Sequence, residues 1–391
     1  MAFTINDKIM ISLFKVFMNP GVEIPLKEVL YSGFIGQGKK VDEFESLLKQ
    51  RYDNKFILTV NSATSGLHLM LRLAKDKAML EYPYASSIEV LTSPLTSIPT
   101  NWPILANGMR IKWVDVGMDC NMDLDDLKAK LSPSTRIILL IHWGGNPINL
   151  GKVRDIQDYC FEQWKFTPIV IQDCAHAIGS KLNDHWLSDW YPSVFSFQAI
   201  KHFTTGDGGC ITFMGKEDYD KAKLLRWYGI DRESPLIAVR CMDDIKDWGY
   251  KFHMNDINAT IGISQMPHAD EIVGKHISNA KYYLENLDEY YKPCAPESND
   301  YESSYWLFTM LLPDESSRLE FMKFMTDKGV MVSQVHARND SHTCFEESLI
   351  ELPNVTKFTE RQVSIPVHWK LTEDDRKYIV ACCNIFAKET K

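Results

Sequence analysis

The sequence predicts an α/β protein with a three-layer α/β/α large domain over residues 1–265 and a smaller C-terminal α+β domain over residues 266–391. Short apolar runs alternate with helical segments from about residue 56 to residue 228, and this alternation is typical of a mostly parallel sheet with helices on both faces. Beyond residue 265 the motifs become sparser, and helical segments mix with single strands. A chain of 391 residues is long enough for one large and one smaller domain.

The expected elements follow from hydrophobic periodicity. Buried strands are expected over residues 56–60, 89–93, 110–115, 136–141, 169–171, 194–197 and 210–214, and helices over 123–131 and 216–228. In the C-terminal part we expect strands over 305–312 and 330–335, and helices over 315–328 and 373–388. Near the N-terminus the apolar residues recur at helical spacing, which predicts an amphipathic helix over residues 9–18.

Composition excludes some classes of protein. The formal net charge of −9 argues against a protein that binds nucleic acid through positive charge. The nine cysteines contain no C-x-x-C pair, so we expect reduced thiols in a cytoplasmic protein. No zinc-ligand spacing is present, and no metal is expected. The sequence shows neither a signal-peptide cleavage pattern nor an apolar stretch long enough to span a membrane.

A lysine follows closely after one of the predicted strands. Three residues separate the strand at 194–197 from Lys201, and a Gly-Asp-Gly-Gly turn ends the segment at Gly209. Open α/β sheets bind ligands in the crevice outside the carboxyl ends of their strands. A partly desolvated lysine there has a lowered pKa and can attack a carbonyl to form a Schiff base. A solvated surface lysine would fit the same pattern, because most lysines are exposed.

A second strand end carries a carboxylate. The strand at 169–171 is followed by Gln172 and Asp173, and His176 lies three residues further on. Asp173 either caps a following helix or holds a cationic nitrogen of a ligand, such as the protonated ring nitrogen of pyridoxal phosphate (PLP). His176 is either a ring that lies flat against a ligand or a buried core histidine.

The turn after the strand at 56–60 is built from small residues. Asn-Ser-Ala-Thr-Ser-Gly leads directly into a helix, so backbone N–H groups around Ala63 and Thr64 are expected at a helix N-terminus. Such a terminus is a ready site for an anion. A serine or threonine cap with no anion bound would have the same sequence.

The stretches QDCAHAIGS and SFQAIKHFTTGDGG, in this order and at this separation, resemble the motifs of the DegT/DnrJ/EryC1/StrS family, which are PLP-dependent sugar aminotransferases of fold type I. The resemblance runs from about residue 24 to the C-terminal end. It implies that PLP is the cofactor and that Lys201 is the catalytic Schiff-base lysine. It further implies a homodimer with active sites at the subunit interface. The cofactor-binding residues that it implies are Ala63, Thr64, Asp173, His176, Ser196 and Lys201, with Lys251 or His253 reaching the phosphate bound by the other subunit.

Several positions are candidates for contact with the substrate. The resemblance places Gly36, Gln37 and Gly38 in a loop that lines the active site, and Arg226 in the family's R-x-x-G-I motif. The loop residues fit an ordinary loop equally well. Arg338 lies in a polar, basic segment and is a candidate for gripping a carboxylate or phosphate, although a surface arginine is as plausible.

One position departs from the family pattern. An aromatic residue usually occupies the place of Ser97 and stacks on the cofactor ring, which serine cannot do. Either Trp102 or another aromatic residue takes over this role, or His176 provides the stacking from the other face, or the pocket is wider.

The reaction that the resemblance implies is transfer of an amino group from L-glutamate to a keto group of a nucleotide-linked sugar of the 4-keto-6-deoxy type, for amino-sugar or surface-polysaccharide biosynthesis. Lys201 would move the proton between the donor and the cofactor. Three alternatives stay open. They are a transaminase of a non-nucleotide keto sugar such as an octulosonic acid or a cyclitol, a sugar 3-dehydratase, and a PLP-binding sensor without turnover. Dehydratases of the family carry histidine in place of Lys201, and the complete set of Asp173, His176 and Lys201 argues against a sensor.

Overall fold

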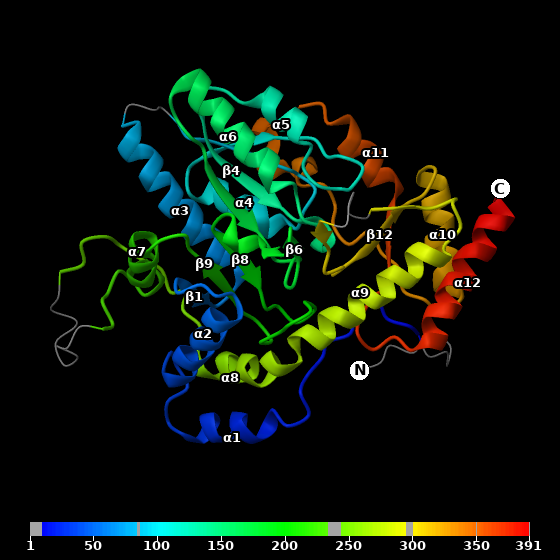
Figure 1. Ribbon diagram of the computed structural model, residues 1–391, viewed down its shortest axis with the longest axis horizontal. Helices are drawn as coiled ribbons and strands as arrows, with labels where there is room; N and C mark the ends of the chain where they lie inside the picture. Colours follow the sequence, from blue (N-terminus) through cyan, green and yellow to red (C-terminus); the bar gives the residue numbers. More distant parts are fainter. Residues whose placement is uncertain (1–9, 84–86, 234–243, 295–299, 349, 391) are drawn as a thin grey trace.

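The computed structural model describes residues 10–83, 87–233, 244–294, 300–348 and 350–390 (Figure 1). Its centre is a seven-stranded sheet with the order β1-β9-β8-β5-β4-β2-β3. β9 runs antiparallel to both of its neighbours, and all other neighbouring strands are parallel. This confirms the predicted fold class. The strands are β1 (Ile57–Val60), β2 (Glu89–Thr92), β3 (Arg110–Trp113), β4 (Thr135–Ile141), β5 (Ile169–Asp173), β8 (Ser193–Ser196) and β9 (Gly209–Thr212).

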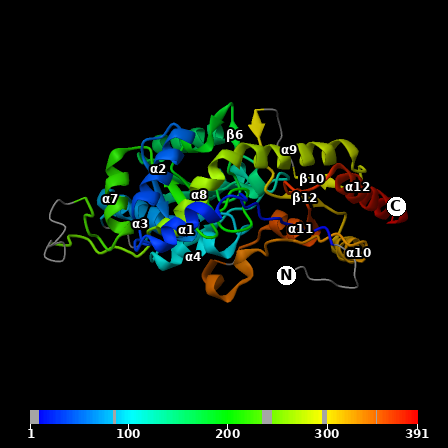
Figure 2. The same cartoon turned by 90° about the horizontal axis from the view of Figure 1, so that it is seen from below.

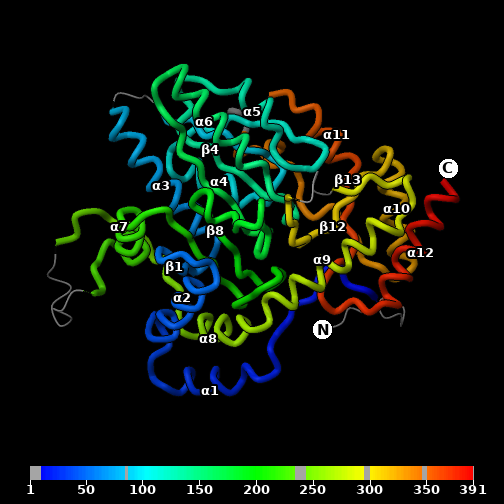
Figure 3. The backbone as a smooth tube through the Cα atoms, viewed as in Figure 1, coloured from blue at the N-terminus to red at the C-terminus, as the bar shows by residue number. Residues whose placement is uncertain are grey.

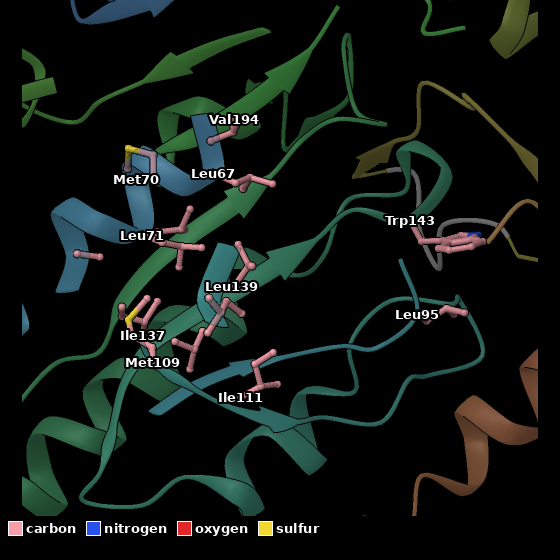
Figure 4. Close-up of a cluster of buried hydrophobic side chains, with 14 of the residues drawn as sticks. Leu67, Met70, Leu71, Leu95, Met109, Ile111, Ile137, Leu139, Trp143 and Val194 are labelled. Carbon is pink, nitrogen blue, oxygen red and sulfur yellow. The ribbon is translucent and has the colours of Figure 1, made fainter. Parts of the chain in front are cut away.

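The two faces of the sheet carry separate hydrophobic cores, because successive side chains of a strand point to opposite faces. Ile137 and Leu139 of β4 pack in one cluster with Leu67, as Figure 4 shows, whereas Ile138 and Leu140 belong to the other. Helices therefore cover both faces, as predicted. The first cluster includes residues of α3 (Ala63–Glu81), α4 (Ile98–Ala106) and α7 (Lys216–Arg226), and the second includes residues of α2 (Lys39–Arg51), α5 (Leu124–Lys130), α6 (Leu150–Trp164) and α8 (Asp256–Gln265).

The C-terminal part builds a third core around an antiparallel sheet with the order β10-β12-β13. The long helix α9 extends from α8 toward the C-terminal helix α12 (Figure 2). The elements here are α9 (Ala269–Asn286), β10 (Lys292–Pro293), β12 (Phe308–Leu311), α10 (Glu315–Asp327), α11 (Pro353–Arg361), β13 (Gln362–Ile365) and α12 (Glu373–Thr390). This arrangement is consistent with the predicted α+β unit, while the boundary at residue 265 stays a prediction.

The remaining elements are short. A small sheet with the order β11-β6-β7 joins Tyr301–Glu302, Lys181–Leu182 and His185–Trp186. The 3₁₀ helices are η1 (Trp143–Gly145), η2 (Leu187–Asp189), η4 (Met266–His268), η5 (Asn339–Ser341) and η6 (Thr343–Ser348). Within the described residues, no helix combines the length and the apolar character needed to cross a membrane.

The predicted helix over residues 9–18 is wrong for its described part. Residues 10–18 form no helix, and Ile11 forms a β-bridge with Val330. Backbone carbonyls of this segment accept hydrogen bonds from side chains of His368 and Trp369 instead of from a following helical turn. The segment then runs to α1 (Glu23–Tyr31), which packs on α8 (Figure 3). Tertiary partners therefore overrode the helical spacing of its apolar residues.

The predicted strand over residues 330–335 is also wrong. Only single bridges occur there, Ile11 to Val330 and Ser333 to Ser364. Val335 has a φ of 65°, a left-handed backbone conformation that a continuous strand does not contain. The chain therefore turns at Val335.

The cysteines are not all free. Cys120 and Cys294 form a disulfide with a Cα–Cα distance of 6.2 Å, which corrects the expectation of nine reduced thiols. Asn146 donates a hydrogen bond to the Cys294 carbonyl and its own carbonyl accepts one from Asn121. These bonds hold the loop after β3 against the end of β10 and bring the two cysteines together.

Candidate functional site

A cavity of about 300 Å³ lies at the edge of the central sheet where the parallel strands end. Ile141, Asp173 and Ser196, which line it, are the last residues of β4, β5 and β8. The segments that follow these strands, and those that follow β1 and β2, supply most of the other walls. The remaining lining residues are Ser62, Ala63, Thr64, Leu67, Thr96, Ser97, Pro99, Thr100, Ala175, His176, Gln198, Ile200, Lys201, Asp207, Trp306 and His336.

Lys201 lies in this cavity, in the turn that follows β8. Its side chain is partly exposed to the cavity, and its amine lies 3.5 Å from the ring centroid of Trp306. Burial lowers the pKa of Lys201 to about 7, although the nearby carboxylate of Asp173 acts in the opposite direction. A substantial share of the amine is therefore unprotonated at neutral pH and able to attack a carbonyl.

Asp173 is buried at the end of β5 and is held by two donors. The Thr100 hydroxyl donates to Oδ2 over 2.7 Å, and the Ala175 N–H donates to Oδ1 over 2.9 Å. Burial raises the pKa of Asp173, while both hydrogen bonds and the charge of Lys201 oppose the rise. A cationic nitrogen in the cavity would give this carboxylate the counter-charge that burial demands.

The N-terminus of α3 presents backbone donors to the cavity. The Ser62 side chain accepts the Ser65 N–H over 3.1 Å, whereas the N–H groups of Ala63 and Thr64 belong to the first turn and have no acceptor within the helix. Gly209 approaches this turn so closely that a Cβ atom on it would lie 2.8 Å from the Ala63 nitrogen. With the Ser196 hydroxyl on the next wall, the arrangement suits an anion.

His176 belongs to a cluster of rings at the inner end of the cavity. It stacks on Trp306 with ring centroids 4.0 Å apart, and its ring is nearly parallel to that of His336 at 5.5 Å. Burial and the charge of Lys201 hold the pKa of His176 well below its ordinary value, so the ring is neutral. Trp102, considered in place of the aromatic missing at Ser97, lies at the surface beside His68 and does not line the cavity.

Two predicted residues lie outside the cavity of their own chain. The Lys251 side chain is exposed, and its carbonyl accepts a hydrogen bond from Asn61. His253 lies against Trp227 with ring centroids 3.8 Å apart. Neither lines the Lys201 cavity, so their predicted contact with the phosphate of a partner subunit stays a prediction.

The predicted substrate residues of the N-terminal loop lie elsewhere. Gln37 and Arg226 line a second pocket of about 320 Å³, and the Gly36 carbonyl accepts the Asp256 N–H. Arg226 is buried, and its Nη1 donates to Glu45 and to the Thr59 carbonyl over 2.7 Å each. These contacts give Arg226 a structural role and do not support the predicted contact with substrate.

Arg338 also has protein partners. Its guanidinium forms two hydrogen bonds with the Asp340 carboxylate and one with the Thr356 hydroxyl. It does not line the cavity, whereas His336, two residues earlier, does. The predicted contact of Arg338 with substrate therefore stays a prediction, while the segment that contains it does reach the cavity through His336.

Thr100, Trp306 and His336 are site residues that sequence reasoning missed. Thr100 lies in α4, a helix that was not predicted, and its side chain reaches Asp173. Trp306 was predicted only as part of a strand, and it precedes the actual strand β12. No local pattern connects Trp306 or His336 with a site at Lys201, because the fold brings them there over more than 100 residues of sequence.

Comparison with known proteins shows that the chain is similar to aminotransferases. The sequence profile of the DegT/DnrJ/EryC1/StrS aminotransferase family matches residues 23–384. The chain is 29% identical over 365 residues to a UDP-4-amino-4,6-dideoxy-N-acetyl-beta-L-altrosamine transaminase of Campylobacter jejuni, covering 90% of each chain. In structure it is similar to AtS13 from Actinomadura melliaura, with a TM-score of 0.91 and 41% identity over 97% of this chain and all of that one. It is also similar to the sugar aminotransferase CalS13 from Micromonospora echinospora, with a TM-score of 0.89 and 39% identity over 96% of this chain and all of that one.

Proposed function

The chain belongs to the DegT/DnrJ/EryC1/StrS aminotransferase family, and we propose that it is a PLP-dependent enzyme that transfers an amino group from L-glutamate to a keto group of a nucleotide-linked sugar. One observation carries this proposal. Lys201 follows β8, and Asp173 is the last residue of the neighbouring parallel strand β5. Both residues line the same cavity and interact through their charges. Lys201 supplies an amine that is partly neutral at pH 7, and Asp173 supplies a buried anion.

The residues of the cavity fit PLP. The N-terminus of α3 and the Ser196 hydroxyl would hold the phosphate, since Ala63 and Thr64 offer backbone donors there. The Asp173 carboxylate would hold the ring nitrogen, and Lys201 would bind the aldehyde carbon covalently. His176 would lie beside the ring. A phosphate, a cationic nitrogen and an aldehyde are thus each matched by a group of suitable chemistry.

When bound, PLP acts as an electron sink for the carbon that bears the amino group. The chain's own part in the reaction is to keep Asp173 ionised, which preserves the charge of the ring nitrogen. Lys201, once released from the cofactor, would carry the proton to and from the reacting carbon as a general base and acid. A lysine pKa of about 7 suits this role, because proton transfer in both directions is efficient when the pKa lies near the working pH.

The proposed acceptor rests on the comparisons. CalS13 is described as a sugar aminotransferase, and the Campylobacter jejuni relative as a transaminase of a UDP-linked amino sugar. We therefore assign the acceptor class as a nucleotide-linked sugar of the 4-keto-6-deoxy type. We also propose that the working enzyme is a homodimer in which Lys251 or His253 reaches the cofactor phosphate of the partner subunit.

Transfer of an isotope tests the proposed reaction. The purified protein is incubated with PLP, ¹⁵N-labelled L-glutamate and UDP- or dTDP-linked 4-keto-6-deoxy sugars. Mass spectrometry should then show an amino sugar that carries the label. The Lys201→Ala variant should give none. A labelled product from a free keto sugar alone, or loss of the sugar's 3-hydroxyl without transfer of nitrogen, would overturn the proposal.

A further inference from the structure

Trp306 touches both the amine of Lys201 and the backbone that carries it. The lysine amine lies 3.5 Å from the centroid of the indole ring. The indole Nε1–H donates to the carbonyl of Ile200, the residue before the lysine, over 2.9 Å. On the other flank of the lysine, the His202 ring pairs through Nε2 with the Ser304 carbonyl over 2.9 Å. Residues 304–306 therefore hold both neighbours of Lys201.

The indole itself is fixed from several sides. Phe14 stacks on Trp306 with centroids 5.3 Å apart, and His176 stacks on it at 4.0 Å. The preceding residue, Tyr305, has a φ of 47°, and its carbonyl pairs with Nδ1 of His276 over 3.0 Å. Residues other than glycine rarely adopt this left-handed backbone conformation, and it persists only where the surrounding structure imposes it. Only 1% of Trp306 is exposed, so the ring has little freedom to leave the amine.

We propose that Trp306 is a positioning residue for Lys201: its ring covers one side of the amine and keeps water from that side, and its N–H fixes the turn from which the lysine reaches the reacting carbon. The inference deepens the proposed function and rests on it only in naming Lys201 as the reacting amine. This chain has Ser97 where an aromatic residue usually stands in the family pattern. Trp306, from the C-terminal part of the chain, provides an aromatic wall of the cavity.

The protonation of Lys201 can be followed separately from that of the histidines that face it. Asp173 faces it from β5, His176 from the segment after β5, His202 from its own turn and His336 from the C-terminal part. Burial keeps the pKa of His336 at about 3 and those of His176 and His202 well below the ordinary histidine value. These three rings therefore stay neutral between pH 6 and 11, where the lysine titrates.

Competitive labelling of the full-length protein without cofactor tests the proposal. Trace acetic anhydride is added at pH values from 6 to 11, and peptide mass spectrometry gives the midpoint of Lys201 acetylation. The wild type should show a midpoint of about 7, against the ordinary lysine value of 10.5. Trp306→Ala and Trp306→Gln admit water or a polar atom, so each should raise the midpoint by at least about one unit and slow labelling at pH 6 about tenfold.

Two controls separate positioning from general loosening. Trp306→Phe keeps a ring over the amine and should leave the midpoint within about half a unit of the wild type. Trp369→Ala removes another indole that donates to a carbonyl, that of Lys15, but does not touch Lys201, and it should leave the midpoint unchanged. A wild-type midpoint in both Trp306→Ala and Trp306→Gln would overturn the proposal, as would an equal shift in Trp369→Ala. Because acetylation requires neither PLP nor turnover, such a result would leave the proposed function standing.

Discussion

At the scale of single residues, the hydroxyl of Thr100 is one of the groups that keep Asp173 ionised. Thr100 donates to Oδ2 of Asp173, and its own Oγ1 lies 3.0 Å from Oγ1 of Thr96. Burial pushes the carboxylate toward its neutral form, and the hydrogen bond from Thr100 opposes this. A hydrogen bond to a charged group contributes about 1.5–3 kcal/mol, so its loss would let burial raise the pKa of Asp173 further. Thr100 is therefore part of the site although it touches no reacting atom.

The matched variants Thr100→Val and Thr96→Val test this dependence. Thr100→Val should weaken PLP binding and lower kcat by about tenfold, because the pKa of Asp173 rises when the hydrogen bond is lost. Thr96→Val removes a hydroxyl one step further away and should have a smaller effect. Asp173→Asn, which removes the charge altogether, should lower kcat by at least about 100-fold. The PLP dissociation constant and kcat are measured at several pH values; equal effects of the two valine variants would contradict the role of Thr100.

The sequence predicted those site residues that lie next to strand ends. Asp173 and Lys201 could be placed because residues that follow parallel strands meet at one edge of the sheet. Trp306 and His336 could not, since their positions depend on how the C-terminal part folds against that edge. Arg226 was predicted from its place in the family's R-x-x-G-I motif, and Arg338 from its polar, basic segment. Arg226 pairs with Glu45, a distant residue that no local pattern connects with it, whereas the partner of Arg338 is Asp340, only two residues away.

At the scale of elements, a buried ion pair joins α7 to α2 and β1. Glu45 and Arg226 are 9% and 5% exposed in their side chains and lie 2.7 Å apart. Glu45 also accepts hydrogen bonds from the N–H and the hydroxyl of Thr59. Removing one partner leaves a buried charge uncompensated, which typically costs about 3–5 kcal/mol.

Arg226→Met should therefore lower the free energy of unfolding by about 3–5 kcal/mol. The double variant Glu45→Leu with Arg226→Met should recover part of this loss, because no unpaired charge remains. Chemical denaturation measures both effects, and KM for the keto sugar is measured below the unfolding range. An unchanged unfolding free energy together with a raised KM would instead restore the predicted contact of Arg226 with substrate.

The elements that were predicted correctly are those whose hydrophobic pattern agrees with their packing. Each predicted strand of the central sheet is present, because alternating residues such as Ile137 and Ile138 are divided between two cores. The segment over residues 10–18 has helical spacing, but Ile11 pairs with Val330, so a distant partner decided its conformation. The segment over residues 330–335 has apolar residues typical of a strand, but Val335 turns the chain.

At the scale of the whole molecule, the proposed homodimer explains why Lys251 and His253 do not line the cavity of their own chain. If they complete the phosphate site of the partner subunit, each active site contains residues of both chains. Two inactive proteins can then restore one another. Lys201→Ala lacks the reacting amine, and the double variant Lys251→Ala with His253→Ala lacks the residues that cross the interface.

Mixing these two inactive proteins under conditions of subunit exchange should restore activity. Heterodimers then contain one site with all of its residues, and about one quarter of the wild-type activity is expected from random mixing of equal amounts. Amino-sugar formation measures the recovery, and a mixture without subunit exchange is the control. Activity that stays at the level of the separate variants would show that Lys251 and His253 act within their own subunit or not at all.

The central claim is that Lys201 binds PLP covalently and that the protein accepts an amino group from L-glutamate. An absorbance spectrum of the purified protein with PLP, recorded before and after L-glutamate is added without any acceptor, tests both parts. We predict a visible band that Lys201→Ala lacks and that glutamate converts to shorter wavelength. A keto sugar of the correct class should then restore the band. A band that is unchanged by glutamate, or that is present in Lys201→Ala, would contradict the account.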